Sequence, residues 1–400
     1  LAVPATSTAG DVIMGDGGHD TTAPDGARQG RDFRTMSNFW RRQHWRSLQA
    51  TWQTFGLSRE LVTAVLRDPA LRAGTRLSLG LDNVFFPSWR EAVVKEPVFL
   101  VGHPRSGTTM LHRCLTQADD FVVFEFWQLL FPALTARKVV GPLVRSRNAQ
   151  GKDVLMPKEV GHGASLGEVD EEELLFVIHA LTQFYPVLSG LAFSDEDFDE
   201  IVFSDDLPEP IRRASMAYLD GCLRRQMLFT GRDRVVAKMN YSGMRIHTLL
   251  EAFPDCRIVY LVRSPLETIP SHLSLHRNVL AHRHGLSRIP PAKLDRYLRR
   301  RYEHNVDFYR VLEQTLASGE VPGSQVMTVS YDDLMNDLDG VVSRVADFAD
   351  LKLSEQLRQQ VAHQAVDQRS YRRPHENLRL EDFGITRAEL LRDLDFVLER

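Results

Sequence analysis

A short apolar run that ends in a loop of glycine and hydroxyl side chains constrains the fold more than any other part of this sequence. The run PVFLVGHP, residues 97–104, is rich in β-forming residues and ends in glycine and proline, which is typical of a buried parallel strand. The segment GTTMLHRCLTQ, residues 107–117, then has the apolar spacing of a helix. Because backbone N–H groups at a helix N-terminus bind phosphate, this junction predicts an anion-binding loop between a strand and a helix.

The loop departs from the common nucleotide-binding pattern at one position. Gly102, Gly107 and Thr109 fit the spacing G-x-x-x-x-G-K-[ST], but Thr108 stands where the pattern has lysine. A triphosphate with magnesium normally receives that lysine and an acidic metal ligand as well. We therefore expect a compact anion, bound by hydroxyl groups, backbone amides and the guanidinium of Arg105. Taken alone, the stretch is also compatible with an incidental turn.

Further apolar runs alternate with helical segments along the chain. The runs RVVAKMN, CRIVYLVRSP and SQVMTVSYDDL, at residues 234–240, 256–265 and 324–334, have the composition of strands, and helical patterns separate them. Strands that alternate with helices form right-handed crossover units. The sequence therefore predicts an α/β fold with a central, mostly parallel sheet flanked by helices.

The chain divides into three regions by composition. Residues 1–30 are rich in Gly, Thr, Ala and Asp without apolar periodicity, which predicts a disordered leader. Residues 31–95 predict a helical N-terminal extension, in which one helix is expected to end before Pro69. Residues 96–400 form the expected main domain, and within it the acidic segment at 166–186 predicts a helix.

The overall charge and the cysteine content exclude several classes of protein. Lys and Arg number 49 against 53 Asp and Glu, a formal net charge of -4, so we expect no nucleic-acid partner. Three widely spaced cysteines argue against both a disulfide framework and a cysteine-built zinc site, and indicate a reducing compartment. No apolar run reaches the roughly 18 residues that a membrane span needs. We therefore expect a soluble, cytoplasmic protein.

A second stretch is placed to bind another phosphate. In YLVRSPLETIPSHLSLH, residues 260–276, Arg263 follows an apolar strand and Ser271 lies eight residues later on the expected helix. An arginine at the carboxyl end of a strand can bind a phosphate in a bidentate manner, and a serine two turns along can add a hydroxyl. Alone, the stretch is more often a surface arginine and a capping serine.

Together the two stretches resemble the signature pair of the sulfotransferases that use 3'-phosphoadenosine 5'-phosphosulfate (PAPS). PRSGTT resembles the family's 5'-phosphosulfate loop, and RSPLETIPS has the spacing of its 3'-phosphate site. The similarity continues through LHRCL, AFPDCRIVYLVRSP and VSYDDLMND over about 270 residues, and is greatest to the larger bacterial-type and eukaryotic branch. The resemblance implies a P-loop-like fold, PAPS as donor, adenosine 3',5'-bisphosphate (PAP) as product, and no metal. The donor-binding residues that it implies are Arg105, Ser106, Gly107, Thr108, Thr109, Arg263 and Ser271.

A basic segment near the C-terminus adds one further candidate for the donor site. DQRSYRRPHENLR, residues 367–379, places Arg372 where it could close over the 3'-phosphate. A solvated basic turn is an equal alternative.

The resemblance also implies a catalytic lysine, whereas the general base stays open. Lys238 ends a strand where the family carries a lysine that stabilises the leaving phosphate, and an exposed strand-end lysine is the alternative. The cytosolic branch has a histidine two residues later, but this chain has Asn240, which cannot accept a proton at neutral pH. Glu125 and Glu171 are the candidate bases, although acidic residues at a helix start usually serve only the helix dipole. His162 is a weaker candidate.

The predicted function is in-line transfer of a sulfuryl group from PAPS to a hydroxyl acceptor. A P-loop small-molecule kinase is the first alternative, against which Thr108 argues, and a catalytically inactive binding protein on the same fold is the second. A small molecule, a glycan and a lipid alcohol are all compatible acceptors. A homodimer is compatible with the N-terminal helices.

Overall fold

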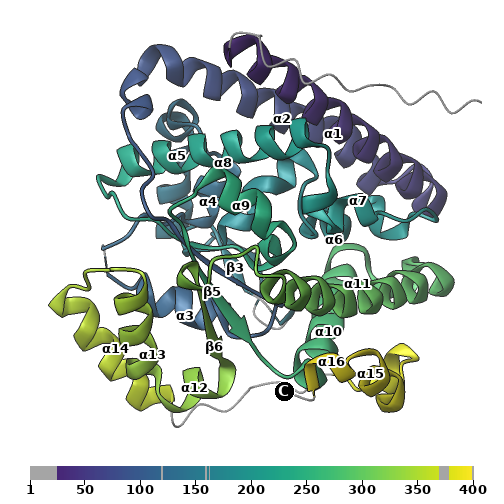
Figure 1. Ribbon diagram of the computed structural model, residues 1–400. Coiled ribbons are helices and arrows are strands. Elements are labelled where there is room, and N and C mark those ends of the chain that lie inside the picture. Colours follow the sequence, from purple (N-terminus) through teal and green to yellow (C-terminus); the bar gives the residue numbers. More distant parts are fainter. Residues whose placement is uncertain (1–24, 119, 158–159, 162, 369–377, 399–400) are drawn as a thin grey trace, which may run out of the picture.

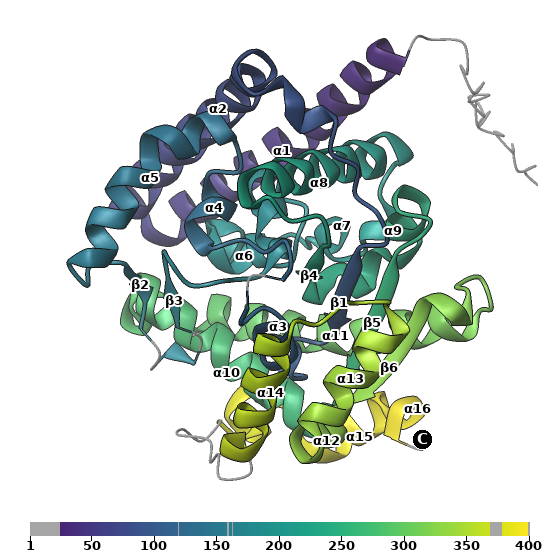
Figure 2. The same cartoon turned by 90° about the vertical axis from the view of Figure 1, so that its left-hand side faces the viewer.

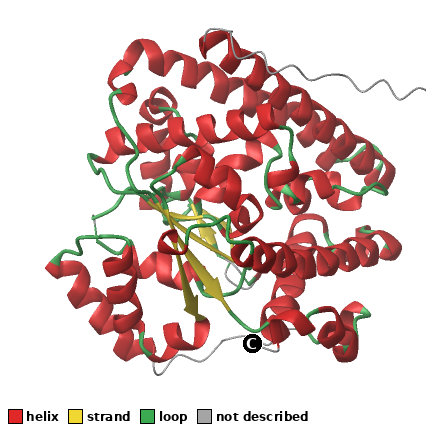
Figure 3. Cartoon of the chain, in the orientation of Figure 1, coloured by secondary structure: helices red, strands yellow, loops and turns green. Residues whose placement is uncertain are grey.

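The computed structural model describes residues 25–118, 120–157, 160–161, 163–368 and 378–398. A four-stranded parallel sheet lies at the centre, with helices on both faces (Figures 1 and 3). Its strands, in the spatial order β4-β1-β5-β6, are β4 (Val236–Lys238), β1 (Val98–Gly102), β5 (Arg257–Val262) and β6 (Val326–Ser330). A short antiparallel hairpin joins β2 (Val154–Met156) to β3 (Ala164–Ser165). The expected α/β architecture is confirmed.

Alternation along the strands divides the apolar core between the two faces of the sheet. On β1, Val98 and Leu100 pack on one face, and Phe99 and Val101 pack on the other. The first face is covered by α3 (Thr108–Leu115), α13 (Leu338–Phe348) and α14 (Glu355–Gln368). The second is covered by α8 (Glu209–Thr230), α9 (Ile246–Ala252) and α11 (Pro291–Ala317). Because the strands are parallel, all four end at the same edge of the sheet.

Shorter elements complete the described chain. The α-helices are α4 (Phe126–Leu130), α5 (Leu134–Ala149), α6 (Phe184–Leu188), α7 (Asp199–Val202), α10 (Pro265–His284), α12 (Tyr331–Asn336), α15 (Arg387–Asp393) and α16 (Asp395–Leu398). The 3₁₀-helices are η1 (Pro87–Arg90), η3 (Glu172–His179), η4 (Gly190–Phe193), η5 (Ser204–Asp206), η6 (Asn240–Arg245), η7 (Leu286–Arg288), η8 (Gly323–Gln325) and η9 (Leu380–Phe383). Within the described ranges, no helix combines the length and the apolar character needed to cross a bilayer.

Two long helices precede the sheet, of which the first packs against α8 and the second against α5 (Figures 1 and 2). The first, α1 (Asp25–Phe55), begins inside the stretch expected to be a leader, whose residues 1–24 lie outside the described chain. The sequence predicts that the second, α2 (Arg59–Phe85), ends before Pro69, but the helix continues through this residue. A proline removes one backbone N–H from a helix, and tertiary contacts of the later turns outweigh that loss.

The acidic segment at 166–186 does not form the single helix that its sequence predicts. It forms the 3₁₀-helix η3, which ends where Ala180 adopts a left-handed conformation with a φ of 57°. Its Glu172 Oε2 accepts a hydrogen bond from the backbone N–H of Lys238 at 2.7 Å. Since β4 is an edge strand, this carboxyl group satisfies an N–H that no neighbouring strand can reach.

Glu172 is fully buried, and burial raises the pKa of its carboxyl group from 4.5 to about 8. Between pH 4.5 and about 8, the folded protein therefore keeps a proton on Glu172 that the unfolded chain has released. Because of this group, the free energy of unfolding falls as the pH rises towards 8. The wild type should lose free energy of unfolding between pH 5.5 and 8, and we expect this loss to be smaller by about 1–2 kcal/mol in Glu172→Gln. Urea denaturation at the two pH values measures this, with the exposed Glu251→Gln as control. An unchanged pH dependence in Glu172→Gln would contradict the buried neutral carboxyl group.

Candidate functional site

The loop between β1 and α3 has the backbone conformation of an anion-binding turn. Arg105 and Gly107 both adopt left-handed conformations, with φ of 81° and 97°. A Cβ atom on Gly107 would lie 2.9 Å from the side chains of Tyr331 and Leu334, so the close approach of α12 requires glycine. The first N–H groups of α3 have no acceptor within the helix, which makes the amides of Thr108 and the next residue available to an anion.

The loop also contains an unsatisfied hydroxyl group. Ser106 is fully buried, and its Oγ has no hydrogen-bond partner among the described residues. A buried hydroxyl without a partner is unfavourable unless a ligand or water supplies one. Free amides, a lone hydroxyl and a nearby guanidinium form a donor set that fits a phosphate or phosphosulfate group.

Three of the predicted donor-binding side chains meet beside this loop. Arg105 Nε donates to Ser271 Oγ at 3.0 Å, and Arg263 donates to the backbone carbonyl oxygen of Arg105 at 3.1 Å. Arg263 also stacks on the ring of Tyr331, 3.8 Å from the ring centre, and pairs with Glu267. The arginine after β5, the serine of α10 and the loop after β1 thus form one cationic cluster at the carboxyl edge of the sheet.

Lys238 lies at the same edge, where β4 ends. Its Nζ is 3.4 Å from Glu171 Oε2, and both side chains are buried. Asn240 Nδ2 donates to the same carboxylate oxygen at 2.7 Å. The buried Oδ1 of Asn240 has no partner in the described part of the chain. Lysine, carboxylate and amide therefore form a compact polar group with one open acceptor.

The last glutamate of the acidic segment, Glu173, anchors the chain that follows Lys238. Glu173 Oε2 accepts a hydrogen bond from Ser242 Oγ at 2.6 Å, and its Oε1 lies 3.5 Å from the Arg245 guanidinium. Arg245 also stacks over the ring of Phe176, 4.2 Å from its centre. The sequence interpretation missed these roles of Glu173. The run EVDEEE was the available signal, because three consecutive carboxylates in an apolar context need buried partners.

The other candidate base, Glu125, occupies a different environment. It precedes α4, and its Oε2 accepts a hydrogen bond from the indole N–H of Trp127 at 2.6 Å. Its backbone N–H donates to Gln128 Oε1 at 3.0 Å. These contacts give Glu125 a local role in starting α4. His162 and Arg372, two further candidates, lie outside the described residues.

A buried histidine network links the cationic cluster to the chain after Lys238. The sequence interpretation also missed this network. His272, next to Ser271, shares a hydrogen bond of 2.9 Å with the hydroxyl of Tyr241 and one of 2.8 Å with His276. His276 in turn contacts the hydroxyl of Tyr297 at 2.6 Å. Burial lowers the pKa of both histidines well below 6.5, so the rings are neutral at neutral pH. Their spacing of four residues on one helix was the available signal.

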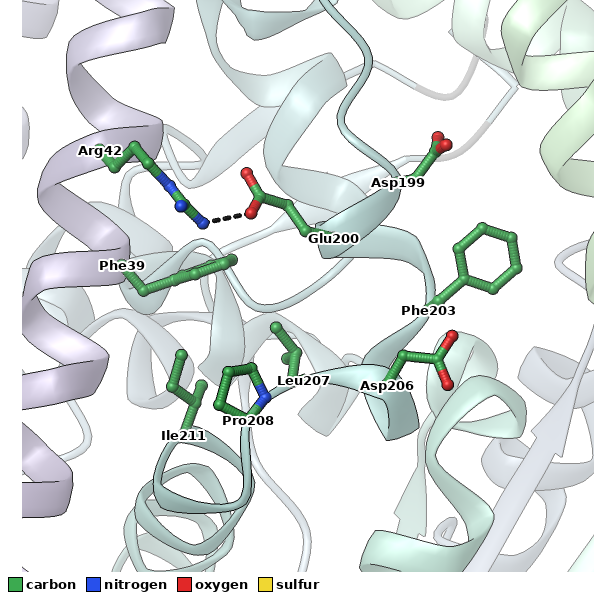
Figure 4. Close-up of a pocket in the computed structure, with 9 residues that line it drawn as sticks. All are labelled: Phe39, Arg42, Asp199, Glu200, Phe203, Asp206, Leu207, Pro208 and Ile211. Atoms are coloured by element: carbon green, nitrogen blue, oxygen red, sulfur yellow. Dashed lines mark hydrogen bonds and ion pairs between the residues drawn. The ribbon is translucent and has the colours of Figure 1, made fainter. Parts of the chain in front are cut away.

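Two surface hollows lie away from this cluster. One, of about 350 Å³, is bordered by Phe39 and Arg42 of α1 and by Glu200 of α7, and Arg42 pairs with Glu200 across it (Figure 4). The other, of about 480 Å³, lies against α1, α2 and α8 and includes Tyr218. Within the described ranges, no group of three or more His, Cys, Asp or Glu side chains is placed to bind a metal.

Comparison with known proteins identifies the family of this chain. Residues 97–355 match the model of the sulfotransferase family. The omega-hydroxy-beta-dihydromenaquinone-9 sulfotransferases Stf3 of Mycobacterium bovis and Mycobacterium tuberculosis are each 28% identical over 279 residues. The match covers 67% of this chain and 66% of each relative.

Solved structures share the fold. Sulfotransferase STF9 from Mycobacterium avium superimposes with a TM-score of 0.67 at 18% identity, covering 95% of this chain and 97% of that one. Sulfotransferase STF1 from Mycobacterium tuberculosis gives a TM-score of 0.63 at 19% identity, covering 94% and 99%. At these identities the structures establish the fold alone. The family match, which spans more than half of the sequence, shows that this chain belongs to the sulfotransferase family.

Proposed function

We propose that this protein transfers a sulfuryl group from PAPS to the hydroxyl group of an apolar, lipid-like alcohol. The observation that carries the proposal is the meeting of Arg105, Arg263 and Ser271 beside the β1 loop, with Lys238 at the end of the neighbouring strand. Two cationic groups would thus be available for the donor's phosphates, and one for the leaving oxygen, at a single edge of the sheet, which supports the proposal. The three cysteines are buried and unpaired, which favours a cytoplasmic location.

The donor would be bound by the loop and the cationic cluster. The amides after Gly107, the hydroxyls of Thr108 and Thr109 and the unsatisfied Ser106 Oγ would bind its 5' end. Arg263 and Ser271 would bind the 3'-phosphate. We infer that Arg263 exchanges Glu267 for that phosphate, because the carboxylate is exposed and a bidentate phosphate contact is stronger. When bound, PAPS supplies a sulfuryl group activated by its anhydride bond to phosphate.

Lys238 and Glu171 would carry the proton and charge changes of the transfer. Glu171 takes the proton of the acceptor hydroxyl as the hydroxyl oxygen bonds to sulfur, so the hydroxyl donates its hydrogen bond to this carboxylate, which Asn240 Nδ2 orients. Once Glu171 is neutral, its pairing with Lys238 weakens, and the ammonium group neutralises the charge on the departing phosphate oxygen. Burial strengthens this electrostatic effect, since the local dielectric constant is low. Glu125, engaged by Trp127, is the less suitable base.

The acceptor class rests on the curated relatives. Their names specify a menaquinone-derived lipid carrying an omega-hydroxyl group. We propose an acceptor of the same general chemistry, a primary alcohol on a long apolar chain, without assigning the same molecule.

Donor binding can be tested by calorimetric titration with PAP beside ATP with magnesium. We expect tight, metal-independent binding of PAP, weakened about 30-fold in Arg263→Ala, equivalent to about 2 kcal/mol for a charged hydrogen-bonded contact. Arg310→Ala is a matched control, because Arg310 also pairs with a carboxylate of its own helix and lies over an aromatic ring. Binding of ATP with magnesium alone would favour the kinase alternative, and binding of neither would favour the inactive protein.

The assignment of the base can be tested by the pH dependence of kcat. We expect Glu171→Gln to lower kcat by about 100-fold or more and to remove the loss of activity at acidic pH, since the titrating base is gone. Glu125→Gln should still lose kcat at acidic pH. PAP release with a polyprenyl alcohol as acceptor gives the rate, and PAP affinity checks that both variants fold. If kcat instead became independent of acidic pH in Glu125→Gln and stayed dependent on it in Glu171→Gln, Glu125 would be the general base.

A further inference from the structure

Helix α2 has its polarity reversed relative to a typical surface helix. Its buried side chains are polar, namely Arg72, Thr75, Ser78 and Asp82. Its outward face carries large apolar side chains over six turns. The exposed fraction of these outward side chains rises from 47% for Val62 to 71% for Val84. The apolar outward residues are Val62, Leu66, Leu77 and Val84, which helical periodicity places on one side. At 1.5 Å per residue this stripe is about 33 Å long.

Internal hydrogen bonds fix the orientation of α2, so the apolar stripe cannot turn inward. Asp82 is completely buried and accepts hydrogen bonds from the backbone N–H groups of Leu134 at 3.0 Å and Thr135 at 2.8 Å, which start α5. It also pairs with the buried Arg225 of α8 at 2.8 Å. Rotation of α2 would leave these charges buried without partners, which costs several kilocalories per mole. The exposure of the stripe is therefore built into the packing.

Helix α5 lies beside α2 and extends the exposed apolar surface (Figure 2). Its Val139 and Leu143, one turn apart, are 76% and 63% exposed. We call the outward side chains of the two helices the apolar face, which consists of Val62, Leu66, Leu77, Val84, Val139 and Leu143. So many exposed aliphatic side chains on two adjacent helices are unusual on a monomeric soluble protein and indicate an interaction site.

The charges around the apolar face are positive. Helix α5 exposes Lys138, Arg145 and Arg147, and it carries no acidic residue. The exposed charged residues of α2 are Arg59, Arg67 and Arg76. Glu60 pairs with Arg288, and Asp68 offsets Arg67, so Arg59 and Arg76 give this helix surface its net positive charge. An apolar stripe between basic side chains is the pattern of a helix that lies in the plane of an anionic membrane surface.

We propose that the apolar face docks on an anionic lipid bilayer, with its aliphatic side chains at the boundary of headgroups and acyl chains and its basic residues against the headgroups. A second copy of the chain fits this face less well. A symmetric pair would bring the same patch of both copies together, and with it their basic residues. Anionic headgroups neutralise those residues instead.

The proposed docking face is connected to the reaction site. The chain that leaves α5 passes through β2, where Val154 and Leu155 are also exposed, and reaches Gly161, whose carbonyl oxygen accepts a hydrogen bond from Arg105 at 3.2 Å. We infer that an acceptor in the bilayer would reach the site along this segment of the chain. This route for an acceptor rests on the proposed function, whereas docking itself does not.

Vesicle co-sedimentation of the full chain tests the docking, with phosphatidylcholine alone and with one quarter phosphatidylglycerol. We expect binding to the anionic vesicles at least tenfold tighter than to neutral ones, and weakened by salt. The double variant Leu66→Asp with Leu77→Asp should lose it at least tenfold. The control is Val93→Asp with Leu391→Asp, which changes two exposed apolar residues outside the face and should bind as the wild type does.

PAP affinity, measured on every variant, separates this proposal from the proposed function, because no part of the face belongs to the donor site. Vesicle binding without PAP binding would support docking and contradict sulfotransfer. Absence of wild-type vesicle binding would overturn the docking proposal. Analytical ultracentrifugation that shows a dimer broken by Leu66→Asp with Leu77→Asp, together with no vesicle binding, would assign the face to self-association.

Discussion

Three consecutive glutamates at the start of η3 determine where the chain goes after β4, and the proposed reactive part of the site depends on them. Glu171 contacts the ammonium group of Lys238, Glu172 accepts the backbone N–H of the same residue, and Glu173 fixes Ser242 and the chain beyond. Their burial has an energetic cost, which hydrogen bonds offset only because each group has a partner. Burial raises the pKa of the Glu172 carboxyl group and lowers that of the nearby His112 to about 3, so their contact at 3.8 Å is between neutral groups at neutral pH.

The proposed donor side of the site has a different origin. It is built from the ends of parallel strands, where loops after β1 and β5 converge because the sheet brings them together. The left-handed backbone at Gly107 lets Tyr331 approach from the end of β6, and Tyr331 in turn supports the guanidinium of Arg263. Each of the four strands therefore contributes to one edge. The buried histidine network connects this side to the chain that follows Lys238.

The parts of the fold that could be predicted from sequence are those with local signals. The four strands and the helix after the loop have clear apolar periods, and the spacing from Arg263 to Ser271 follows from a strand joined to a helix. Parallel pairing then explains why Arg105 meets Ser271. The alignment of Lys238 with Leu100 on the neighbouring strand follows from the same sheet.

The remaining features depend on tertiary contacts that a local pattern does not contain. Pro69 was expected to end a helix, but the hydrogen bonds of Asp82 to α5 and α8 stabilise the turns beyond it. Periodicity identifies a helix with one apolar face, yet it cannot tell which face is turned towards water. The reversed polarity of α2 is visible only in the folded chain. Whether Glu125 or Glu171 lies beside Lys238 was equally open until β4 and η3 were placed together.

The 3₁₀ geometry of η3 has a consequence for how this family member can vary in length. A 3₁₀-helix has three residues per turn, so neighbouring side chains project about 120° apart. Three adjacent glutamates reach their separate partners because the segment from Lys238 to Arg245 follows the surface of η3. Insertion or deletion of one residue near Glu172 would rotate the carboxylates that follow it by a third of a turn relative to those before it. These carboxylates would then lose their present hydrogen-bond partners together. Substitutions can change this segment one contact at a time, whereas a change in its length disrupts the whole set.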